Sequence, residues 1–180
     1  MRTGLALSVA AARWATHFYA RHFWLVFGLS MIPTVQRFVA VRYGDDLPAA
    51  VGVGGEIVTG LSRLLLVYAV LRMVFREPDL SGLTPGQRWR RLAAGIDADV
   101  RAFWTQFLVL AVAFVLLDVV PNTAIAVLVP DGRQELVTSV LVSVKNPTVI
   151  AFTVLWMVGV GRTLMVEGRR VGAVGESAAV

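Results

Sequence analysis

The sequence predicts an all-α, polytopic membrane protein built as a bundle of four transmembrane helices. The chain is 57% hydrophobic and only 16% charged over 180 residues, its apolar residues gather in four long runs, and its arginines are concentrated in every second connection. A spanning helix needs roughly 20 mostly apolar residues, so four spans and their connections account for the chain. We therefore expect a single membrane domain over residues 1–170 and a mobile cytoplasmic tail over 171–180.

The first two spans are expected at about 23–41 and 51–75. The first contains Pro33 and ends at a turn-rich segment, 44–48, which contains two aspartates, a glycine and a proline. Because this connection is short, the two helices are expected to be antiparallel neighbours.

An amphipathic helix is expected at the cytoplasmic interface before the third span. Thr84, Pro85 and Gln87 have the threonine, first-turn proline and third-position glutamine of a capped helix start. Apolar residues then follow at helical spacing, with arginines mostly on other faces. The third span is expected at 103–120, possibly extending to 129.

The fourth span is expected at 148–166, after a segment, 130–147, that has apolar residues on one helical face and ends at Asn146-Pro147. We interpret that dipeptide as a helix stop. The segment is therefore predicted to be a short outer helix, amphipathic or re-entrant, and a kinked extension of the fourth span is the alternative.

Basic residues predict the orientation of the four spans. Only Arg42, Arg133 and Lys145 fall on the outer side if the amino terminus is inside, and Arg37 and Arg63 lie within spans. The cytoplasmic side then holds all the others: Arg2, Arg13, Arg21, Arg72, Arg76, Arg88, Arg90, Arg91, Arg101, Arg162, Arg169 and Arg170. This distribution satisfies the positive-inside rule and predicts that both termini are cytoplasmic. The preference for arginine, with Lys145 the single lysine, is a bias that we associate with bacterial genomes, so we expect a bacterial cytoplasmic membrane.

The expected spans carry an intramembrane polar network, which consists of Arg37, Glu56, Thr59, Arg63, Asp118 and Asn122. A charged side chain near the bilayer centre costs roughly 2.5–3.5 kcal/mol on insertion scales, so each needs a partner. We expect Arg63 to pair with Glu56 or Asp118, and Arg37 to pair with the other carboxylate. Such pairs would hold the helices together, or they would form a path for an ion or a polar substrate.

A basic group, Arg88, Trp89, Arg90 and Arg91, lies on the predicted interfacial helix. The tryptophan suits headgroup depth, and the guanidiniums suit phosphates or a partner's acidic patch. We expect anionic membrane lipids as partners, together with another membrane protein or further copies of this chain. In a chain this apolar, the net charge of +5 is attributed to topology and lipid binding, not to nucleic acid.

Several classes of chemistry have no support in the sequence. There is no cysteine, which excludes disulfides and thiolate metal sites. His17 and His22 are expected in or beside the cytoplasmic interface and not deep within a span, where haem ligands would lie. Asp97 and Asp99 point about 200° apart on a helix, which is a poor metal site. No phosphate-binding loop, nucleophile elbow or HExxH motif is present, so no catalytic residue, cofactor or metal is predicted.

The sequence therefore favours a non-catalytic integral membrane subunit, scaffold or assembly factor of a larger membrane complex. An oligomeric transporter or channel that uses buried Glu56, Arg63 and Asp118 is the alternative. A membrane-embedded lipid-modifying enzyme, built from the scattered acids, ranks third.

Overall fold

The computed structural model describes residues 4–43 and 48–177, and the side chains of 4–43 and 48–168. All regular elements in these ranges are helices. In chain order they are α1 (Gly4–Arg21), α2 (Phe23–Tyr43), α3 (Ala49–Val74), α4 (Pro85–Ala98), α5 (Val100–Phe114), the π-helical turn η2 (Val115–Val119), α6 (Val120–Leu128), α7 (Asp131–Lys145), the π-helical turn η3 (Asn146–Ile150) and α8 (Ala151–Ser177).

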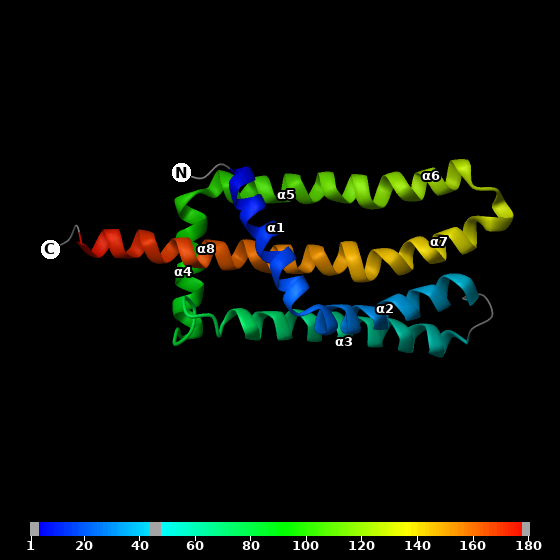
Figure 1. Cartoon of the computed structure of the whole chain (residues 1–180), viewed down its shortest axis with the longest axis horizontal. Helices are drawn as coiled ribbons and strands as arrows, with labels where there is room; N and C mark the ends of the chain where they lie inside the picture. Colours follow the sequence, from blue (N-terminus) through cyan, green and yellow to red (C-terminus); the bar gives the residue numbers. More distant parts are fainter. Residues whose placement is uncertain (1–3, 44–47, 178–180) are drawn as a thin grey trace.

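Four helical stretches are long and apolar enough to cross a membrane: Phe23–Tyr43, Ala49–Val74, Val100–Leu128 and Asp131–Gly168. Even the shortest, with 21 residues, reaches the roughly 30 Å of a hydrocarbon core at 1.5 Å per residue. They run along the long axis of the molecule (Figure 1). The prediction of four apolar spanning-length helices is confirmed, and the third has the longer of its two predicted extents. The turn-rich segment predicted after α2 lies mostly outside the described residues.

The fourth stretch is one continuous helix and does not begin at residue 148. α7 continues through η3 into α8, so the prediction that Asn146-Pro147 stops a separate outer helix is wrong, and the alternative of an extended fourth span describes the structure. A π-helical turn accommodates the proline, whose missing N–H would break an ordinary helical ladder. The Tyr19 hydroxyl donates to the Pro147 carbonyl at 2.6 Å, which occupies an acceptor in this disturbed turn. Burial raises the pKa of the Tyr19 hydroxyl above its ordinary value.

α4 lies across one end of the molecule, nearly perpendicular to the long helices, and this end is called the α4 end (Figure 1). The predicted start is present: the Thr84 hydroxyl accepts from the Gln87 N–H, and the Gln87 side chain accepts from the Thr84 N–H. α4 does not continue into the third span, because the chain turns at Asp99, whose carboxylate caps α5 through the Ala102 N–H at 3.0 Å.

Two glycines allow α4 to cross α8 at backbone contact. A Cβ added at Gly95 would lie 2.2 Å from the Leu164 carbonyl oxygen, and one added at Gly168 would lie 2.1 Å from the Arg91 carbonyl oxygen. Gly159 has a similar role against α1, where an added Cβ would meet Ala11 and Trp14 at about 3 Å. Close crossings of this kind require residues without side chains.

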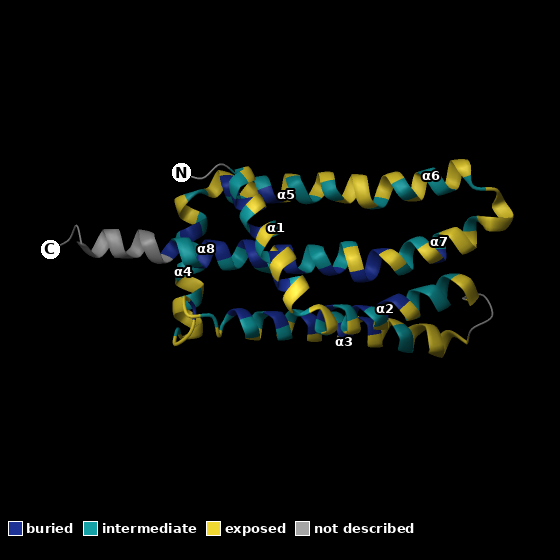
Figure 2. Ribbon diagram, viewed as in Figure 1, coloured by how far each residue is buried: buried dark blue, intermediate teal, exposed yellow. Residues whose placement is uncertain are grey.

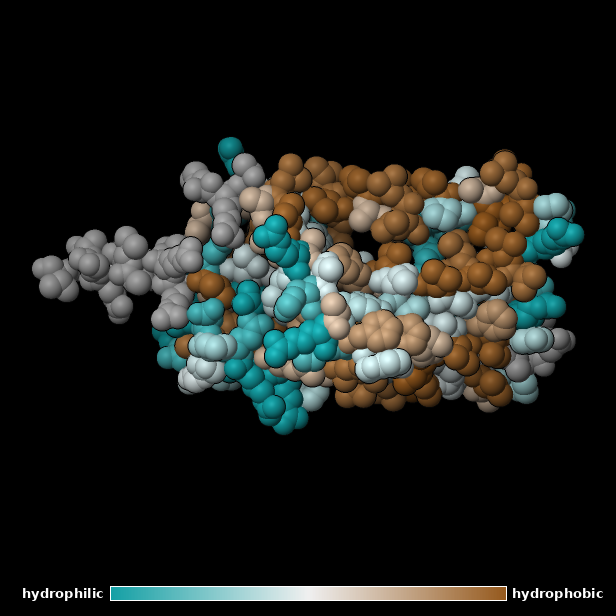
Figure 3. Space-filling view, viewed as in Figure 1, coloured by the Kyte–Doolittle hydropathy of each residue, from teal (hydrophilic) through white to brown (hydrophobic). Residues whose placement is uncertain are grey.

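The core lies where α1 crosses α8. α1 runs obliquely over the long helices and buries Leu7, Ala11 and Ala15, while α8 contributes Leu155 and Trp156 (Figure 2). α3 adds a second row of buried residues toward the α4 end, Leu66, Val70 and Val74. The helix formed by α5, η2 and α6 is much more exposed than the other long helices, because only 6% of its most apolar 18-residue segment is buried. It forms most of one apolar side of the molecule (Figure 3).

Candidate functional site: charged residues between the long helices

The structure divides the predicted polar network into separate clusters. In the first, Arg37 on α2 pairs with Glu56 on α3, with 3.0 Å between Nη1 and Oε1. Gln36 donates to the same carboxylate at 3.3 Å and accepts from the Thr59 hydroxyl at 3.2 Å. Gly55 allows this close approach, since an added Cβ would lie 3.0 Å from the Gln36 side chain. The cluster therefore ties α2 to α3.

The Arg37–Glu56 pair is not enclosed by the chain. The Arg37 side chain is 39% exposed and that of Glu56 is 51% exposed. Glu56 stands on one helical face with Gly52 and Gly60, four residues to either side. A Cβ added at either glycine would find no atom within 4 Å. This part of α3 is thus a small-residue surface with a half-exposed ion pair at its centre.

The second cluster joins the third and fourth long helices. Lys145, at the end of α7, pairs with Asp118 in η2. The pair lies far from the helix ends: Asp118 is about 27 Å from Val100 and about 15 Å from Leu128 at 1.5 Å per residue. Lys145 is 10% exposed and Asp118 is 37% exposed. The prediction that Lys145 lies in an outer connection is wrong, because the fourth helix already begins at Asp131.

Arg63 does not pair with either carboxylate that the sequence suggested. Its Nη2 donates to the Asn146 Oδ1 at 3.3 Å, and Asn146 donates in turn to the Pro33 carbonyl at 3.4 Å and to the Val142 carbonyl at 3.2 Å. The Arg63 Nε is buried and has no hydrogen-bond partner among the described residues. It lies beside a cavity of about 20 Å³, which also borders Ser30 and Ser62. That volume suffices for one water molecule.

Asn146 belongs to this network although the sequence does not predict it, and one predicted member of the network stays outside. The apolar face that precedes Asn146 continues through Val144, and this could have indicated that the helix does not end there. Asn122, in contrast, is exposed on α6. The structure does not bring it to Arg63.

A further cluster, which sequence reasoning missed, lies toward the α4 end. Glu77, in the connection after α3, accepts from the Arg162 Nε at 2.6 Å and from the Trp14 indole at 3.4 Å. The Arg162 guanidinium also stands 6.0 Å from the Trp14 ring. Three elements distant in sequence meet at one carboxylate, and no local pattern marks such a meeting.

Two side chains of the basic group on α4 contact the rest of the chain, and the other two are exposed. Arg88 lies 4.3 Å from the centre of the Phe75 ring, and Arg91 donates to the Asp79 carbonyl at 3.2 Å. Trp89 is 70% exposed, and Arg90 is exposed as well. The outward pair is therefore free to contact lipid or a partner, whereas Arg88 and Arg91 help to fix α4 to the rest of the chain.

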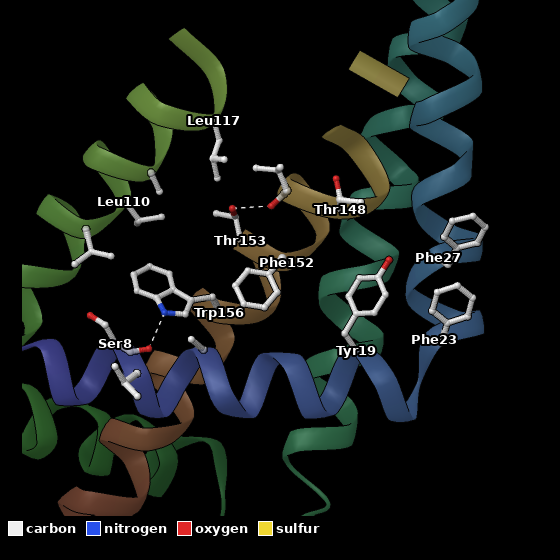
Figure 4. A pocket seen from close by; sticks show the side chains of 15 residues that line it. Ser8, Tyr19, Phe23, Phe27, Leu110, Leu117, Thr148, Phe152, Thr153 and Trp156 are labelled. Carbon is white, nitrogen blue, oxygen red and sulfur yellow. Dashed lines mark hydrogen bonds between the residues drawn. The ribbon is translucent and has the colours of Figure 1, made fainter. Parts of the chain in front are cut away.

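A cavity of about 790 Å³ lies between α1, α2, α5 and α8. Figure 4 shows its aromatic side chains, with the Trp156 indole donating to the Ser8 carbonyl at 3.1 Å. The lining is almost entirely apolar. Its polar lining groups are four hydroxyls, each of which donates a hydrogen bond within the chain: Ser8, Tyr19, Thr148 and Thr153. Such a cavity suits a hydrocarbon ligand.

Among the described residues, no three histidine, cysteine, aspartate or glutamate side chains gather as metal ligands would. Comparison of the chain with protein-family models, with curated proteins and with solved structures found no match. The function must therefore be argued from the geometry of the molecule itself.

Proposed function

We propose that this protein is a non-catalytic subunit, scaffold or assembly factor of a larger membrane complex. It crosses a bacterial cytoplasmic membrane four times with both termini in the cytoplasm, and α4 lies at the cytoplasmic interface. The observation that carries the proposal is the half-exposed Arg37–Glu56 pair on the small-residue surface of α3.

This surface would be unfavourable against lipid alone. Glu56 is seven residues inside α3, about 10 Å along the helix, so in the proposed membrane its carboxylate lies below the headgroups, at the depth of the hydrocarbon. Small residues in membrane helices allow another helix to approach closely, and polar side chains then bond across the interface. A partner helix seated over Gly52, Glu56 and Gly60 would enclose the ion pair and fill the open space beside both glycines.

Extraction of the native membrane into polymer-bounded lipid discs tests the proposal. The chain should be recovered in a fixed stoichiometry with another membrane protein, as measured by native mass spectrometry. Gly60→Leu should abolish this association, because the leucine would occupy the space that the partner helix needs. Gly28→Leu is the matched control, since Gly28 is equally open but lies on α2. A chain that is monomeric in such discs, or loses its partner equally in both variants, would contradict the proposal.

An oligomeric transporter or channel is the second candidate, and the Asp118–Lys145 pair favours it. A carboxylate and an amine that lie deep between long helices, with Asp118 partly accessible, are groups that proton- or ion-coupled transport uses. Under this candidate the chain associates only with itself. Liposomes containing the protein should then show ion flux that Asp118→Asn abolishes while the fold is retained.

A further inference from the structure

The cavity between α5 and α8 lies between two attachments that join the surrounding helices. At one end, α1 joins α5, where the Ser8 hydroxyl donates to the Gln106 Oε1 at 2.7 Å and the Gln106 Nε2 donates to the Gly4 carbonyl at 2.9 Å. At the other end, Lys145 bridges to Asp118. These attachments hold the helix formed by α5, η2 and α6 at a fixed separation from the helix formed by α7, η3 and α8. The space-filling view shows open gaps beside the first of these two helices (Figure 3).

The length of the cavity restricts what can occupy it. Val109 and Leu117, the first and last residues of this helix that line the cavity, are eight residues apart, which corresponds to about 12 Å along the helix. A partner helix that crosses the membrane must continue over roughly 30 Å and needs a diameter of about 10 Å. α1 crosses that path at one end, and the Asp118–Lys145 pair joins the two long helices just beyond the other end. One leaflet of hydrocarbon, in contrast, is about 15 Å thick, which is close to the length of the cavity.

We propose that this cavity is a binding site for an acyl chain of a membrane phospholipid. Its walls are apolar, with Leu110 and Leu117 from α5 and η2, Phe152 and Trp156 from α8 and Phe27 from α2 (Figure 4). An empty space of 790 Å³ would leave these side chains without dispersion contacts. Lipid chains are the apolar molecules that already surround the spans, and they enter without any polar group being dehydrated.

The headgroup of this lipid lies on the α1 side of the cavity. Val9 borders the cavity and is 60% exposed, and Arg13 follows one turn later on the same helical face. Arg13 is exposed, so its guanidinium is placed to meet the phosphate of a lipid whose chain passes Val9. This site is independent of the proposed subunit surface, because the Gly52, Glu56 and Gly60 face of α3 does not border the cavity.

Tryptophan quenching by brominated acyl chains tests the site. Trp156 is only 6% exposed and borders the cavity, whereas Trp104 is 62% exposed and Trp14 is packed against Gly159. Three single-tryptophan variants, each with the other tryptophans changed to phenylalanine, are placed in lipid discs with brominated phospholipid. Trp156 should be quenched nearly as strongly as Trp104 and at least twofold more than Trp14. Quenching of Trp156 no greater than that of Trp14 would overturn the proposal.

Filling the cavity separates a bound chain from bulk lipid nearby. Ala113→Phe places a ring in the cavity, so quenching of Trp156 should fall at least twofold while that of Trp104 stays unchanged. If this variant does not fold, Val109→Phe serves the same purpose. Unchanged Trp156 quenching in a folded, filled variant refutes the site. Arg13→Ala should reduce Trp156 quenching by a brominated anionic lipid present as a minor component, and no reduction would refute the headgroup position.

Discussion

The crossing of α4 over α8 gives the sharpest structural prediction. Gly95→Ala would place a methyl group 2.2 Å from the Leu164 carbonyl oxygen, and ordinary contact begins near 3.4 Å, so the two backbones must separate by about 1.2 Å. Neither neighbour is a flexible side chain, because both helices present backbone at this point. Gly168→Ala makes the reciprocal change, with the Arg91 carbonyl oxygen at 2.1 Å.

The magnitude follows from two opposing effects. Overpacking a tight contact costs about 1–3 kcal/mol, and replacing a helical glycine by alanine returns up to about 1 kcal/mol. Gly161→Ala is the matched control, because it is also within α8 but would find no atom within 4 Å. Subtracting the control removes the helix-propensity gain. Each crossing variant should therefore be about 2 kcal/mol less stable than Gly161→Ala.

Thermal unfolding in one detergent measures this difference. Two kcal/mol corresponds to a Tm difference on the order of 4–8 °C for a chain of this size. The double variant of Gly95 and Gly168 should lose less than the sum of the single losses, because helices separated by one methyl group already accommodate the second. Crossing variants with the same Tm as Gly161→Ala would refute the close backbone contact.

The remaining predictions concern individual polar contacts. Asp118→Leu alone should destabilise the protein by about 3 kcal/mol, because Lys145 is left buried and unpaired. Adding Lys145→Met should restore much of the lost stability. A double variant that is no more stable than the single variant would contradict a direct pair. Tyr19→Phe should cost about 1 kcal/mol in thermal unfolding through the lost bond to the Pro147 carbonyl, and an unchanged Tm would count against that bond. Gln106→Leu should cost about 1–3 kcal/mol and increase proteolysis of α1, since it removes the hydrogen bonds that join α5 to the Gly4 carbonyl and to the Ser8 hydroxyl. Protection equal to that of the parent protein would show that other contacts hold α1.

Local patterns in the sequence are sufficient to predict those parts of the structure that depend on local chemistry. Apolar runs of about 20 residues define the four long helices, because a hydrocarbon core of fixed thickness demands that length. The capping box at Thr84 and Gln87 involves residues only three positions apart, so it can be predicted directly from the sequence. Arg37 and Glu56 were recognised as candidates because a charge inside an apolar run always needs a partner, and adjacent antiparallel helices supplied one.

Asn146-Pro147 shows where local rules fail. The dipeptide normally ends a helix, but a π-helical turn together with the distant Tyr19 hydroxyl accommodates it here. Once the helix continues, Lys145 moves from the expected outer connection into contact with Asp118, and Asn146 becomes the partner of Arg63. The energy of an unusual turn is compensated by contacts with residues up to 128 positions away, which a local pattern does not contain.

The sequence by itself determined the helical class of this protein, the number of spanning-length helices and the residues whose charges must be compensated. Only the tertiary structure decided which charges pair, that Gly95 and Gly168 form one crossing, and that a cavity lies between α1, α2, α5 and α8. The physical reason is the range of the interactions. Helix formation and apolar length depend on neighbours within a few turns, whereas pairing, close crossings and cavities depend on how helices distant in the chain are placed together.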